Sequence, residues 1–97
     1  MILLIEDEEK LSRTLAEYLE LNGYEVLRAM TGLEGLSMFY DHMHRIDLVL
    51  LDIMLPGEDG YSILERLKAS QETKNIPVIM VTAKEAEFDK VRGLESG

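Results

Sequence analysis

The sequence contains no cysteine and no tryptophan, and it has only two histidines, His42 and His44. Without cysteine the chain cannot form disulfide bonds, bind zinc through thiolates or use a thiol as a nucleophile. With two histidines a multi-histidine metal site is disfavoured. Disulfide scaffolds and thiol chemistry are therefore excluded as explanations of what the chain does.

Positive charge is also scarce, with 10 basic residues against 19 acidic ones and a formal net charge of −9. A surface that binds nucleic acid or anionic lipid needs a basic footprint, so neither partner is expected for this segment. No apolar run approaches the ~20 residues that a membrane helix needs. Because acidic residues directly follow the short apolar start, we expect no signal peptide and a cytoplasmic location.

The chain has 97 residues, of which 46% are apolar, and this is typical of one small domain. Three short runs are apolar, at 2–5, at 47–51 after its first residue Asp47, and at 76–81. Continuous runs favour strands that are covered on both faces, as in parallel sheets. The segment 24–28 alternates more and predicts a strand nearer an edge of the sheet.

Between these runs, apolar residues recur with helical spacing over 8–21, 31–44, 61–70 and 84–94. Asn22 and Gly23 predict the end of the first helix, and Thr31 or Gly32 predicts the start of the second. The resulting order, strand and helix in strict alternation, predicts an α/β domain in which helices cross over a parallel sheet.

Polar side chains follow three of the predicted strands at their carboxyl ends: Glu6 and Asp7, then Asp52, then Thr82. In open α/β sheets ligands bind at this edge. Acids after a strand also stabilise the start of the next helix, which is the simpler interpretation of Glu8 and Glu9. Asp52 is harder to explain in that way, because it follows four apolar residues and a buried carboxylate is costly without a partner.

Neighbouring carboxylates raise each other's pKa or require a cation, and Mg²⁺ is the cation that best suits an oxygen-only site shared with phosphate. An aspartate beside Mg²⁺ can act as a nucleophile towards a phosphoryl group. A hydroxyl one strand away, here that of Thr82, could bind a phosphoryl oxygen.

Three segments together resemble the receiver domain of bacterial two-component response regulators. They read Ile-Leu-Leu-Ile-Glu-Asp-Glu at 2–8, Asp-Leu-Val-Leu-Leu-Asp-Ile-Met-Leu-Pro-Gly-Glu-Asp-Gly at 47–60, and Ile-Pro-Val-Ile-Met-Val-Thr-Ala at 76–83. The resemblance spans residues 1–97. It implies a flavodoxin-like (CheY-like) doubly wound parallel sheet with strand order 2-1-3-4-(5).

The resemblance assigns roles to individual positions. Asp52 matches the phospho-accepting aspartate, and Glu6 and Asp7 match the acid pair that holds Mg²⁺ with it. Met54 matches the residue whose backbone carbonyl completes the metal site. Thr82 matches the phosphoryl-binding hydroxyl that moves on activation, and Ala83 matches the small residue that leaves room for the phosphoryl group.

The family pattern continues beyond Gly97 with a fifth strand, a lysine that pairs with the acceptor, and a fifth helix. These are missing from the sequence, so we expect a receiver domain that is incomplete at its C-terminus and is poorly phosphorylated in this form. The uncovered edge of the fourth strand would favour pairing with another chain. A second copy or a fused output domain is the expected partner there.

The leading hypothesis is Mg²⁺-dependent phosphoryl transfer from a sensor histidine kinase to Asp52, in a signalling domain that is not an enzyme. One alternative is a non-phosphorylated interaction module, or a truncated half-fold that completes its sheet with another chain. Another is a hydrolase with an aspartyl-phosphate intermediate. Such phosphatases place a second acid two residues after the nucleophile, where this chain has Met54, and this disfavours turnover of free substrates.

Overall fold

The apolar runs form one four-stranded parallel sheet in the computed structural model, which describes residues 1–52, 60–71 and 73–81. The strand order is β2-β1-β3-β4, as the resemblance implies. The bounds of the strands are β1 Ile2–Ile5, β2 Val26–Ala29, β3 Leu48–Asp52 and β4 Val78–Val81. Each pairing is parallel, with Leu3 opposite both Leu27 and Val49.

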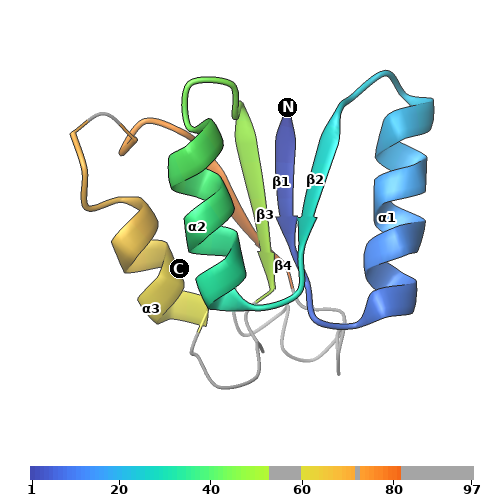
Figure 1. Ribbon diagram of the computed structural model, residues 1–97, viewed down its shortest axis with the longest axis horizontal. Helices are drawn as coiled ribbons and strands as arrows, with labels where there is room; N and C mark the ends of the chain where they lie inside the picture. The colour runs from blue at the N-terminus through green and yellow to red at the C-terminus, as the bar shows by residue number, and fades with distance from the viewer. Residues whose placement is uncertain (53–59, 72, 82–97) are drawn as a thin grey trace, which may run out of the picture.

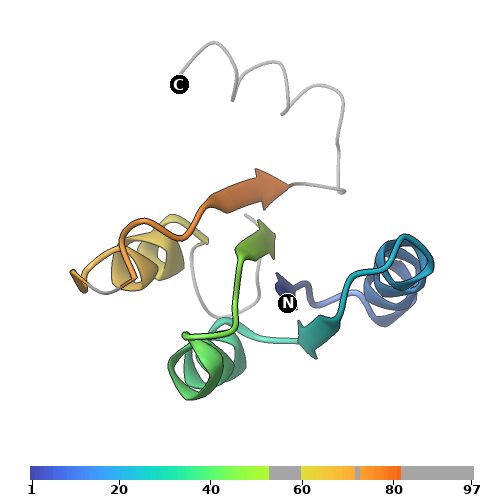
Figure 2. The same ribbon diagram turned by 90° about the horizontal axis from the view of Figure 1, so that it is seen from above.

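Three helices are described, α1 Glu9–Leu21, α2 Gly32–His42 and α3 Gly60–Leu67. Figure 2 shows α2 and α3 on one face of the sheet and α1 on the other. All four strands run in the same direction, so that their carboxyl ends share the edge drawn at the bottom of Figure 1. Within the described ranges, no helix is long and apolar enough to cross a membrane.

The predicted helix boundaries agree with the structure to within a few residues. The Thr31 hydroxyl accepts a hydrogen bond from the Glu34 backbone N–H at 3.1 Å and so caps α2. Gly23 follows α1 with φ of +93°, a conformation in which a side chain would be strained. The helix expected over 84–94 lies outside the described residues.

Two sequence predictions need small corrections. The second strand runs from Val26 to Ala29 rather than over 24–28, and Tyr24 is 54% exposed because it precedes the sheet. The third helix, expected over 61–70, begins one residue earlier at the buried Gly60 and ends at Leu67.

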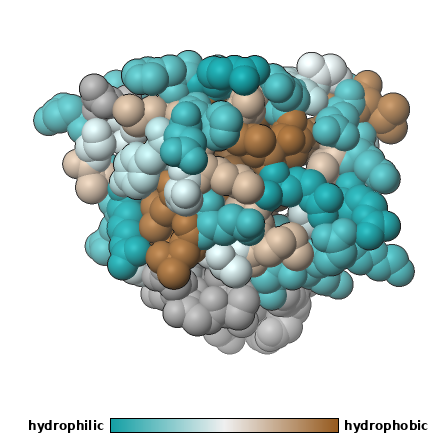
Figure 3. All heavy atoms as spheres, viewed as in Figure 1, coloured by the Kyte–Doolittle hydropathy of each residue, from teal (hydrophilic) through white to brown (hydrophobic). Residues whose placement is uncertain are grey.

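The main core lies between the sheet and the pair α2 and α3. Its ten residues are Leu3, Ile5, Ala29, Leu36, Phe39, Ile46, Val49, Leu51, Ile63 and Leu67. Gly35 lets α2 approach β1 closely, because an added Cβ atom would lie 2.5 Å from Ile5 Cδ1. On the outer surface of this side, Figure 3 shows hydrophobic residues in separate small areas of a mainly hydrophilic surface.

Candidate functional site

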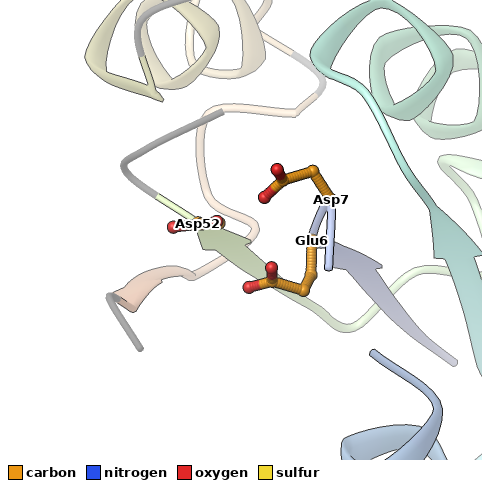
Figure 4. Close-up of side chains that lie close together, drawn as sticks. All are labelled: Glu6, Asp7 and Asp52. Carbon is orange, nitrogen blue, oxygen red and sulfur yellow. The ribbon is translucent and has the colours of Figure 1, made fainter. Parts of the chain in front are cut away.

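Three carboxylates meet at the carboxyl edge of the sheet. Glu6 and Asp7 follow β1 directly, and Asp52 is the last residue of the adjacent strand β3. Each side chain offers an oxygen that lies within 4.8 Å of the others, and Figure 4 shows the three gathered around one space. The structure therefore brings together the three acids that the sequence predicts as one cluster.

Two of the three acids are buried. Asp52 has no exposed surface and Glu6 is 1% exposed, while Asp7 is half-buried. Carboxylates of like charge repel at this separation, and burial weakens the screening by water. Because a carboxylate is costly to bury without a compensating charge, this donor set suits a small divalent cation that prefers oxygen ligands.

The backbone around Glu6 fixes the acid pair relative to the sheet. The N–H of Glu6 donates to the carbonyl of Ala29 at 3.0 Å, so pairing with β2 extends one residue beyond β1. The Glu6 Oε2 atom accepts a hydrogen bond from the N–H of Glu8 at 2.9 Å. One oxygen of this carboxylate thus stabilises the start of α1, which is the simpler role that acids after a strand can have.

Glu8 and Glu9 occupy the start of α1, as predicted. Glu8 is the N-cap residue, although its side chain makes no capping hydrogen bond within the described part of the chain. Glu9 binds Arg13 and Arg28 instead. The hydrogen bond from Arg13 is the main cause of a pKa of Glu9 below its ordinary value, which slight desolvation opposes and the charge of Arg28 supports.

The other predicted site residues are Met54, Thr82 and Ala83, and all three lie outside the described residues. The strands that precede them in the sequence, β3 and β4, are described and are paired with each other. Asp52 is opposite Val81, the residue before Thr82, in the pairing of β3 with β4. The roles of Met54, Thr82 and Ala83 remain predictions from the resemblance.

Comparisons with known proteins agree on one family. The family model described as the response regulator receiver domain matches residues 2–97. The transcriptional regulatory protein CpxR of Escherichia coli K12 is 43% identical over 96 residues, covering 99% of this chain and 39% of its own length. The phosphate regulon transcriptional regulatory protein PhoB of Pseudomonas aeruginosa is 42% identical over 96 residues, covering 99% of this chain and 41% of its own length. The chain therefore spans about two-fifths of these curated relatives.

Solved structures give the same result. The non-phosphorylated receiver domain of HemR from Leptospira biflexa is 35% identical, with a TM-score of 0.78 over 99% of this chain and 74% of its own. The Mn²⁺-bound form of the response regulator Rcp1 is 30% identical, with a TM-score of 0.74 over 97% of this chain and 73% of its own.

Proposed function

The chain belongs to the response regulator receiver family, and from that premise we propose that it accepts a phosphoryl group on Asp52 from a sensor histidine kinase. The observation that carries the proposal is the cluster of Glu6, Asp7 and Asp52, whose oxygens lie within 4.8 Å of one another. Asp52 is proposed as the acceptor because it matches the phospho-accepting aspartate of the family, and it is buried at the end of the central strand β3.

The carboxylates of Asp7 and Asp52 would hold Mg²⁺ directly and Glu6 would act through water, with the backbone carbonyl of Met54 as a further ligand. The donor set fits this ion, since Mg²⁺ binds through one or two carboxylates and keeps water and phosphate oxygens as its other ligands. When bound, the cation neutralises charge on the oxygens of the phosphoryl group. The Mn²⁺-bound form of Rcp1 supports a divalent cation in the same family.

In the transfer, a carboxylate oxygen of Asp52 forms the new bond to phosphorus. The bond from phosphorus to the imidazole nitrogen of the donor breaks, and the imidazole leaves with the electron pair. The hydroxyl of Thr82 binds a phosphoryl oxygen and changes position, and Ala83 leaves space beside it. The added charge then shifts the domain between two states.

The domain acts as a phospho-acceptor that assists its own phosphorylation and dephosphorylation, rather than as an enzyme with a separate substrate. Its curated relatives include proteins named as transcriptional regulators, which supports a role in regulating transcription through other parts of a longer protein. The partner of this domain is a sensor histidine kinase.

The test is incubation with a small acyl phosphate, with and without Mg²⁺, followed by intact-mass measurement. We expect one phosphoryl group to be added only with Mg²⁺, even if conversion is partial. Asp52→Asn should abolish it. Asp47→Asn is the matched control, because Asp47 precedes the same strand at the opposite edge of the sheet. No addition to the unmodified chain, or an addition that survives Asp52→Asn, contradicts the proposal.

A further inference from the structure

The first turn of α1 is joined to β2 through the side chain of Arg28. Its Nε atom donates to the Ser12 hydroxyl at 2.9 Å, and its Nη2 atom donates to Glu9 Oε1 at 2.6 Å. Glu9 and Ser12 are three residues apart, so they lie on the same side of the helix. Ser12 is fully buried and the Arg28 side chain is one-third exposed. The link is therefore a partly buried contact between two elements that lie side by side in Figures 1 and 2.

The same turn is also connected to the acid cluster, through a series of hydrogen bonds that leads back to β2. Ser12 N–H donates to the Glu8 carbonyl at 2.9 Å, and Glu8 N–H donates to Glu6 Oε2. Glu6 N–H in turn donates to the carbonyl of Ala29, the residue after Arg28. A shift of the first turn of α1 away from β2 would therefore move the Glu6 carboxylate.

We propose that Arg28 is a positioning residue for the divalent-cation site, acting through Glu9 and Ser12 to hold the Glu6–Asp7 turn in its binding geometry. The inference rests on the proposed function, because it concerns the same acid cluster. Repulsion among Glu6, Asp7 and Asp52 favours their separation when no cation is bound. A restraint that keeps them together before binding raises the affinity, as hydrogen-bonding groups behind metal ligands commonly do.

The geometry requires arginine, since two separate nitrogens of Arg28 reach two different side chains. Lysine has the same charge, but its single nitrogen cannot occupy the positions of both Nε and Nη2. The substitution Arg28→Lys therefore tests whether the positions of the two donor nitrogens matter, without changing the charge of the side chain. This matters because removing a positive charge near the acids would by itself strengthen cation binding.

Arg13 supplies the matched control. It donates to the other oxygen of Glu9, at 2.9 Å, but it belongs to α1 itself and its side chain is 60% exposed. Arg13→Lys therefore disturbs the same carboxylate without loosening α1 from β2. Thr31→Ala is a second control, because it removes the cap of α2 and lowers stability without removing a contact of Arg28.

The experiment is a Mg²⁺ titration by calorimetry at constant ionic strength, with amide hydrogen exchange measured in the metal-free protein. We expect Arg28→Lys to weaken Mg²⁺ binding by about tenfold. We also expect it to speed exchange at Glu8 and Ser12. The two control variants should stay within about twofold of the unmodified chain.

Equal affinities for Arg28→Lys and Arg13→Lys would overturn the inference and leave the proposed function intact. An equal loss in Thr31→Ala would overturn it as well, because general destabilisation would then explain the effect. If the unmodified chain binds no Mg²⁺, or binds it as well after Asp52→Asn, the proposed function fails and this inference fails with it.

Discussion

The two faces of the sheet are joined to their helices in different ways. On the face covered by α2 and α3, ten buried apolar residues form one cluster. On the other face, a charged strand residue, Arg28, reaches Glu9 and the buried hydroxyl of Ser12 on α1. Apolar packing is non-directional and contributes most of the stability of a domain, whereas hydrogen bonds require defined positions. The apolar cluster thus stabilises the fold. The face that carries Arg28, called the polar face although it also buries Leu4 and Ala16, orients the turn that carries the acid pair.

The largest expected effect is on the apolar face. Phe39 is fully buried at the centre of the cluster, so Phe39→Ala should lower the free energy of unfolding by about 3–5 kcal/mol. Urea unfolding measures this change. If that variant does not fold, Ile63→Val should cost about 0.5–1.5 kcal/mol.

Tyr18→Ala is the control, since Tyr18 on α1 is 65% exposed and its loss should change stability by no more than about 0.5 kcal/mol. A Phe39→Ala cost as small as that of the control would contradict the assignment of the main core to this face.

At the acid cluster we expect a smaller effect, an increase rather than a decrease in the free energy of unfolding. Asp52→Asn removes one of three neighbouring charges, so in the absence of metal the lost repulsion should raise the free energy of unfolding by about 1 kcal/mol. Mg²⁺ at ten times its dissociation constant should stabilise the unmodified chain by about 1.4 kcal/mol and the variant by much less. Thermal unfolding with Mg²⁺ or with a chelator measures both. A variant that is less stable than the unmodified chain without metal would show that other interactions of Asp52 outweigh the repulsion among the three acids.

The sequence predicted the apolar side of this comparison well, for a physical reason. The runs at 2–5 and 47–51 are continuous because both faces of these strands are covered, and they became the central strands β1 and β3. Residues at the carboxyl ends of parallel strands share one edge, and because β1 lies beside β3 this brings Glu6, Asp7 and Asp52 together. The second strand was displaced because one alternating segment does not fix where pairing begins.

The polar side was not predicted, because its contacts depend on how α1 packs on β2. Arg28 is 16 residues from Ser12 and 19 from Glu9, and no local pattern relates them. The sequence does carry one signal of this contact. A charged residue within a predicted strand of a covered sheet needs a partner, and an acid in the first turn of the preceding helix is a candidate for it. The bond from Glu8 N–H to Glu6 could not be foreseen without the turn conformation.

The smallest expected effect distinguishes Arg28 from another arginine that pairs with a glutamate. Arg45 binds Glu25 at 2.8 Å, but their side chains are 60% and 62% exposed. A double-mutant cycle with alanine at these two positions should give a coupling below about 0.5 kcal/mol, and salt should remove it. The same cycle on Arg28 and Ser12 should give about 1 kcal/mol, because the hydroxyl is buried and its partner is charged. Equal couplings would mean that the polar face is held no more firmly than the exposed surface, and the contrast between the two faces would then rest on the apolar core alone.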